Sequence, residues 1–216
     1  MSLQITVRGS AEATYRAERV TVRLRVQAEG DDRAQVHDEA SGALEPIVDQ
    51  LRELESRGAV LDWSTDQVHV LTHTPVEEGQ RSAQRVHVAS VGVVAEFVDF
   101  ERMSGFVDYW SGREVVQVDG LEWDVLARHR RAYEAEARKA AVDDAVAKAQ
   151  AYADAVRRGR VVAVELSDPG MLDHAGEPPW PRGALTKAAF TDGGGLVLEP
   201  PPIVVAVQVD GRFTAS

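Results

Sequence analysis

The chain has 216 residues, of which 44% are hydrophobic, and it carries a formal charge of -11. That length and apolar content suffice for a buried core. The excess of acids repels polyphosphate and anionic lipid, so we expect no nucleic-acid binding. The sequence contains no cysteine, which excludes disulfides, thiolate nucleophiles and zinc–cysteine sites.

No stretch approaches the roughly 18 consecutive apolar residues of a transmembrane helix. The first residues enter a strand pattern at once and leave no room for the apolar core of a signal peptide. We therefore predict a cytoplasmic protein without a membrane span.

Alternating apolar and polar residues at 3–8 and 19–28 predict two half-buried antiparallel strands. The turn formers Gly30, Asp31 and Asp32 then supply a helix N-cap, and helical spacing continues to a stop at Gly58. Pro46 lies inside this segment, where we expect it to kink or divide the helix.

Residues 67–72 and 85–97 predict a hairpin. The apolar phase of the second strand shifts beside Ser90 and Gly92, which suggests a β-bulge there. A short amphipathic helix is expected from Asp99 to Trp110. The next strand, 115–123, is interrupted at Asp119 and Gly120.

A long alanine-rich helix is predicted from about Trp123 to Arg158, with Asp124 as its cap. Small or apolar residues recur every three or four positions and define one packed side. They are Ala137, Ala141, Ala145, Ala149, Tyr152 and Val156. The pairs Glu134–Arg138 and Asp144–Lys148 have the spacing of helical ion pairs.

After the helix come an apolar strand at 161–166, an excursion at 167–202 and a final strand at 203–209. The excursion holds seven of the nine prolines, so regular structure is not expected there. The order of elements predicts an α+β fold with mostly antiparallel sheets built from strand-strand-helix units. We expect one domain, 1–216, with one sheet face covered by the long helix and two others.

The histidines form the one cluster of side chains that suggests a metal site. If the hairpin is symmetric about residues 76–80, His69 and His87 face each other and could bind a divalent metal. Partly exposed histidines without a metal are the simpler interpretation. No catalytic residue and no cofactor is predicted, because the chain lacks nucleophile-elbow, zincin, phosphate-loop and dinucleotide motifs.

Two surfaces are candidates for interactions. Arg19, Arg23 and Arg25 project from one side of a strand and could receive an acidic protein segment or an anionic ligand; a solvated strand face is the alternative. Trp180 stands between prolines in the excursion and could dock on another subunit, or fold back over its own sheet.

The chain resembles the SIMPL-domain family, a group of mostly bacterial proteins of poorly defined function that includes periplasmic immunogenic members. The resemblance covers about residues 3–210 and is carried by ordered segments. They are Ile5–Glu12, Arg19–Gly30, Asp99–Met103, Ala135–Ala153 and Val161–Glu165.

This resemblance implies an α+β fold and a tendency to form large rings or channel-like oligomers, and it implies no catalytic residues. Most relatives carry a signal peptide, whereas the strand pattern at the start of this sequence leads us to expect none here. Ala17 and Glu18 also replace the usual proline and aspartate, and the glycine-containing strand before the long helix matches only loosely at Ser111–Gly112 and Gly120–Leu121.

Together these observations predict a non-enzymatic protein that associates with itself and serves as an oligomeric scaffold or interaction module. Two alternatives stay open: an enzyme that binds a metal or small molecule at His69 and His87, and a binder of acidic segments through Arg19, Arg23 and Arg25.

Overall fold

The computed structural model describes residues 2–74, 76–77, 80–81, 85–172 and 199–216. The fold is α+β with antiparallel sheets, as the sequence predicts. The chain divides into two compact units, and each is described by itself. Unit 1 contains the described parts of 1–16, 125–186 and 201–216, and unit 2 those of 17–124 and 187–200.

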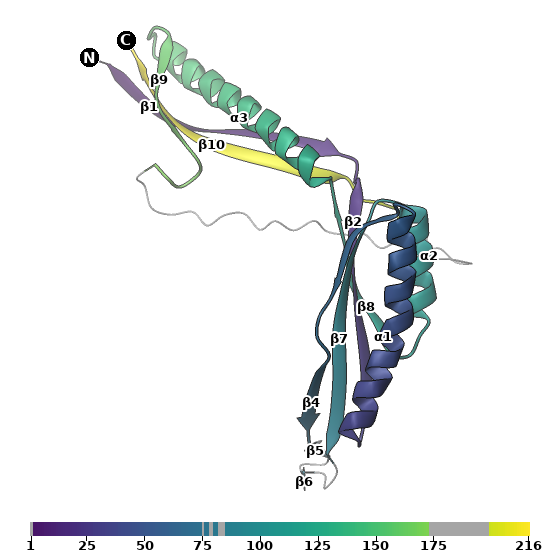
Figure 1. Cartoon of the computed structure of the whole chain (residues 1–216). Coiled ribbons are helices and arrows are strands. Elements are labelled where there is room, and N and C mark those ends of the chain that lie inside the picture. Colours follow the sequence, from purple (N-terminus) through teal and green to yellow (C-terminus); the bar gives the residue numbers. More distant parts are fainter. Residues whose placement is uncertain (1, 75, 78–79, 82–84, 173–198) are drawn as a thin grey trace. The chain divides into compact units, whose positions relative to one another are not determined.

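Unit 1 is a three-stranded sheet in the order β1-β10-β9 (Figure 1). Strand β1 (Leu3–Tyr15) pairs along its whole length with β10 (Ile203–Ala215), from Leu3 opposite Ala215 to Tyr15 opposite Ile203. Strand β9 (Val161–Ser167) pairs with the other side of β10.

Helix α3 (Ala127–Ala155) covers one face of this sheet. Its buried positions form the alanine ladder that the spacing predicted, and the ladder continues at Ala153. Tyr152 and Val156 were wrongly included in the packed side, because they are 61% and 56% exposed. The core of the unit adds Ile5 and Phe213 to these alanines.

Gly9 explains how α3 lies so close to β1. A Cβ placed on Gly9 would lie 2.0 Å from the carbonyl oxygen of Ala141 and 2.8 Å from the Cβ of Ala145. The contact between helix and strand is therefore backbone against methyl groups, which only a glycine opposite alanines permits.

The ion pair between Asp144 and Lys148 stabilises α3, and both side chains also bond to the backbone of β1. The two side chains lie 2.6 Å apart. Asp144 also accepts a hydrogen bond from the Ser10 amide at 2.8 Å, and Lys148 donates to the Arg8 carbonyl at 3.1 Å. These bonds occupy backbone groups of β1 that would otherwise lie at a sheet edge.

Unit 2 is a five-stranded sheet with the main order β3-β7-β2-β8, in which β4 also pairs with β7. Its strands are β2 (Arg19–Gly30), β3 (Val60–Thr65), β4 (His69–His73), β7 (Val86–Phe97) and β8 (Val116–Asp124). Two short strands, β5 (Val76–Glu77) and β6 (Gln80–Arg81), pair with each other.

Helices α1 (Arg33–Ser56) and α2 (Phe100–Ser111) lie on one side of this sheet (Figure 1). The buried core between them contains large side chains, and the rings of Phe97 and Phe106 lie 5.3 Å apart, centroid to centroid. Met103, Ile47 and Leu51 are fully buried in the same unit.

Both helices have an aspartate as N-cap, and the cap of α1 is the predicted one. Asp32 accepts hydrogen bonds from the amides of Ala34 and Gln35 at 2.7 and 3.0 Å. Asp99 accepts from the Arg102 amide at 3.0 Å. Helix α1 runs through Pro46 as one element, so of the two expected effects, a kink or a division, the division does not occur.

Two further local predictions need correction. The N-cap of α3 is Leu126, without a side-chain hydrogen bond, whereas Asp124 ends β8 and pairs with Arg19. The register between β2 and β7 is continuous, so the bulge expected near Ser90 is absent from this pairing. A shift occurs instead in β8, where Asp119 has no partner on β2.

Candidate functional site

The predicted arginines lie on the face of the five-stranded sheet that is opposite the helices. Arg19 donates to Glu96 at 2.6 Å and to Asp124 at 3.0 Å. Its neighbours along β2 are paired too: Arg23 with Glu122 at 3.3 Å and Arg25 with Asp119 at 2.8 Å. The face is thus a row of paired opposite charges and not an open basic patch.

The hydrogen bond to Glu96 is the largest reason why the pKa of Arg19 is raised further above its already high ordinary value. An acidic ligand would therefore compete with carboxylates that are already in place. Such competition reduces the gain from binding at this row.

The structure separates the two candidate histidines. Thr72, and not His69, is the partner of His87 across β4 and β7, and its hydroxyl lies 2.8 Å from Nδ1 of His87. His69 lies opposite Ser90. Because side chains alternate between the faces of a strand, positions 87 and 90 point to opposite faces. The predicted pairing of His69 with His87 is wrong.

The two histidines are separated because the hairpin has a different register from the predicted one, and such a change of register can move a side chain to the other face of the sheet. The register predicted from a turn centred on residue 78 differs from the observed one by three positions. Within the described residues, no group of three His, Asp or Glu side chains is placed to hold a metal ion.

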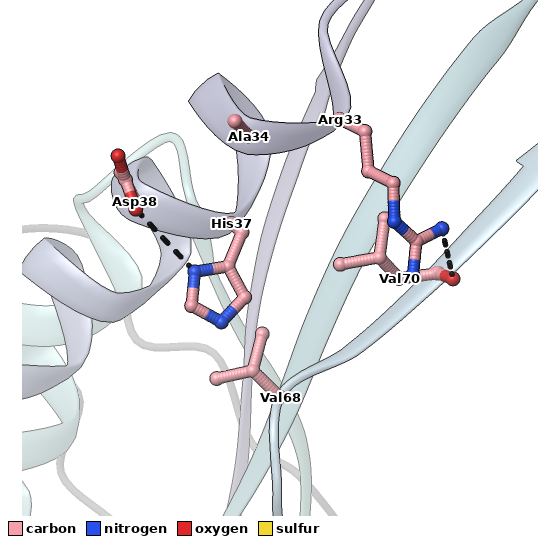
Figure 2. Close-up of a pocket in the computed structure, with 6 residues that line it drawn as sticks. All are labelled: Arg33, Ala34, His37, Asp38, Val68 and Val70. Atoms are coloured by element: carbon pink, nitrogen blue, oxygen red, sulfur yellow. Dashed lines mark hydrogen bonds and ion pairs between the residues drawn. The ribbon is translucent and has the colours of Figure 1, made fainter.

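A hollow of about 450 Å³ lies between the start of α1 and β4 (Figure 2). The sequence did not suggest it. Arg33 donates to the Val70 carbonyl at 3.3 Å, and Nδ1 of His37 lies 3.4 Å from a carboxylate oxygen of Asp38. Val68 completes the wall beside His37. These two polar contacts are separate, because Arg33 bonds to β4 and His37 contacts its neighbour on α1.

Unit 1 carries a different kind of surface, in which large apolar side chains are exposed. Most of the exposed large hydrophobic residues among those described belong to this unit. They are Val146, Tyr152, Val156, Val162, Val164, Leu166, Met171 and Val204, against Leu61, Leu71 and Tyr109 in unit 2.

Three of these residues, Val162, Val164 and Leu166, lie on β9, and their exposed fractions are 64%, 60% and 47%. Strand β9 is the last in its sheet, so no described strand pairs with its outer side. Trp180, the other predicted contact residue, lies outside the described residues.

The sequence did contain a signal for this strand. A run of apolar residues such as Val161–Val164 is typical of a strand that is covered on both faces. The sequence predicts the strand but does not place it at an edge, because strand order depends on contacts between distant segments.

The shifted pKa values of carboxylates in the described residues belong to caps and ion pairs. Hydrogen bonds from Gln35 and Ala34 lower the pKa of Asp32. The Lys148 ammonium and the Ser10 amide lower that of Asp144. The hydrogen bond from Arg8, at 2.7 Å, is the main reason why the pKa of Asp210 is lowered.

These features define an α+β protein of two helix-on-sheet units, with a row of paired charges on one unit and exposed apolar residues on the other. The chain belongs to the SIMPL family, described as a protein of unknown function (DUF541), which it matches over residues 5–213. No curated protein matches it. None of the helices in the described residues is long and apolar enough to cross a membrane.

Proposed function

We propose that this protein is a non-enzymatic subunit that associates with further copies of itself through unit 1. The observation that carries the proposal is the concentration of exposed large apolar side chains on that unit. Exposed apolar side chains are costly in water, and a concentration of them is typical of contact sites between proteins.

The surface of unit 2 also favours unit 1 as the region of contact between copies. Its helix-free face carries arginines that already have carboxylate partners. Exposed ion pairs of this kind contribute little to association, because solvent and salt screen them. Unit 1 instead offers valine and leucine, whose removal from water favours binding at any salt concentration.

Sedimentation velocity over a wide range of protein concentration tests the proposal. We expect species heavier than the 23.5 kDa chain, with a mass that rises with concentration. High salt should preserve or strengthen the association, since its main contribution is apolar. A single 23.5 kDa species at every concentration would contradict the proposal.

The alternative at the arginines has its own test. Binding of an acidic segment at Arg19, Arg23 and Arg25 would be lost in high salt.

A further inference from the structure

Two tyrosine side chains lie face to face where the end of β1 meets the first turns of α3. Tyr133 stands four residues before Ala137, so it takes the next position of the alanine ladder toward the start of the helix. Tyr15 is the last residue of β1 and lies on the same face of the strand as Gly9, which contacts the ladder. The contact between strand and helix therefore ends in a pair of aromatic rings.

The rings of Tyr15 and Tyr133 are stacked and in contact. Their centroids lie 3.6 Å apart, and their planes differ by 12°. Carbon atoms at this separation are at van der Waals distance. Aromatic pairs more often adopt an offset or edge-to-face arrangement, because the faces of two rings carry like partial charges. This pair instead presents the π faces of two phenols to each other.

Two phenols in this arrangement are placed for oxidative coupling. A one-electron oxidant takes one electron from each ring, and each phenol releases its proton to water. The unpaired electron of a phenoxyl radical is shared between the oxygen and the ring carbons ortho to it, so two facing radicals join through a bond between ortho carbons. The hydrogen on each of these carbons then leaves as a proton, and the phenol oxygens regain theirs. The product, dityrosine, has lost two electrons and two protons in all.

We infer that Tyr15 and Tyr133 form a site of oxidative cross-linking, at which a one-electron oxidant joins β1 to α3 by a carbon–carbon bond. Both side chains are half-buried, so a small oxidant can reach them and the rings have room to turn into the geometry of the product. The reaction takes place within one chain and is independent of the proposed self-association.

The cross-link would change the topology of the whole chain. It closes a covalent loop that contains residues 16–132, and with them every described strand and helix of unit 2. A covalent link between distant residues lowers the entropy of the unfolded chain, as a disulfide does. The cross-linked protein should therefore unfold at a higher urea concentration.

Oxidation of the full chain by a photoexcited ruthenium tris-bipyridyl complex with persulfate tests the site. At low protein concentration we expect dityrosine fluorescence. Peptide mass spectrometry should find the peptides of Tyr15 and Tyr133 joined, with two hydrogen atoms lost. A mixture of isotope-labelled and unlabelled protein separates the two kinds of product, because a cross-link within one chain never combines the labels.

Tyr133→Phe removes one phenol and keeps the ring. It should lower the yield of dityrosine within the chain about tenfold or more, since the advantage of two reacting groups held together is lost. Tyr152→Phe is the matched control: Tyr152 lies on the same helix and is 61% exposed, but none of the other described rings is in contact with it. The control should leave the yield unchanged. Circular dichroism verifies that both variants are folded.

Two further measurements test whether the fold holds the rings for reaction. Unfolding in urea before oxidation should lower the yield as Tyr133→Phe does. The oxidised native chain should gain resistance to urea, whereas oxidised Tyr133→Phe, which undergoes the other oxidations but not this one, should gain none.

Three results would overturn the assignment of this site. They are the absence of dityrosine within the native chain, an equal loss of yield in Tyr133→Phe and Tyr152→Phe, and a yield that is unchanged when the chain is unfolded first.

Discussion

In unit 2 the helices contact the sheet through large side chains such as Phe97, Phe106 and Met103, whereas in unit 1 helix α3 lies on β1 through alanines and Gly9. The first kind of core gains stability from the apolar area that each side chain buries. The second gains it from the close approach of two backbones, since an alanine buries little area. Unit 2 should therefore lose stability when a substitution removes side-chain volume, and unit 1 when a substitution adds it.

Phe106→Ala should give the largest effect. Phe106 is fully buried and its ring packs at an angle against those of Phe97 and Trp110, so its loss leaves a cavity. We expect destabilisation of about 3–5 kcal/mol, measured by urea unfolding. Tryptophan fluorescence in a Trp180→Phe background follows unit 2, where Trp63, Trp110 and Trp123 lie. Phe106→Leu, which keeps most of the volume, should lose much less.

Gly9→Ala tests the close approach in unit 1. The added methyl group would overlap the Ala141 carbonyl, so α3 must move, and we expect a loss of about 1–3 kcal/mol. Hydrogen exchange resolved by peptide should show the change first in β1 and α3. Gly120→Ala serves as the control because its Cβ meets nothing within 4 Å. Equal effects of the two substitutions would show that packing against α3 is not the cause.

Gly42→Ala is the same chemical change inside α1 and should have the opposite sign. A Cβ at this position meets nothing within 4 Å, so the methyl group adds no clash. The substitution should stabilise the protein by about 0.5–1 kcal/mol, because glycine loses more backbone entropy than alanine in a helix. The change should appear in thermal unfolding of unit 2. If Gly42→Ala lowers the stability of the protein, the contrast between the open position in α1 and the close contact of α3 with Gly9 is wrong.

The smallest effect is expected from the ion pair between Arg8 and Asp210. Asp210 has a lowered pKa in the folded state, so its contribution is present above the unfolded pKa near 3.9 and is lost as the pH falls through the folded pKa. Asp210→Asn should cost about 0.2–1 kcal/mol at pH 7, and the difference from the native chain should shrink as the pH falls below the unfolded pKa and vanish once Asp210 is protonated in the folded state. Urea unfolding at several pH values measures it. A difference that persists in acid would exclude the ion pair as its origin.

The sequence predicted local structure where one segment contained the whole signal. The Asp32 cap of α1 and the alanines of α3 follow from the sequence of a single helix, and both are confirmed. The exception is the C-terminal end of α3, where Tyr152 and Val156 continue the apolar period by residue type but lie on its exposed side. Alanines differ little in hydrophobicity from their neighbours, so the sequence of such a helix specifies only weakly which of its sides is buried.

Features that depend on distant contacts could not be read from the sequence. The division into two units arises because 3–15 pairs with 203–215 and not with the strand that follows it. The separation of His69 from His87 depends on the register of one hairpin, and the exposure of β9 depends on strand order. Alternation predicts which residues share a face within a strand, and it does not predict which strand lies beside it.

The pairing of β1 with β10 also determines when the units can form during synthesis. The helices of unit 2 and its five-stranded sheet are contained in residues 19–124, so they can assemble while later residues are still being added at the ribosome. Unit 1 needs strands from both ends of the sequence, which lie side by side in Figure 1. Its first strand must wait until about 200 further residues have been translated, so a nascent chain holds β1 without its partner throughout that time.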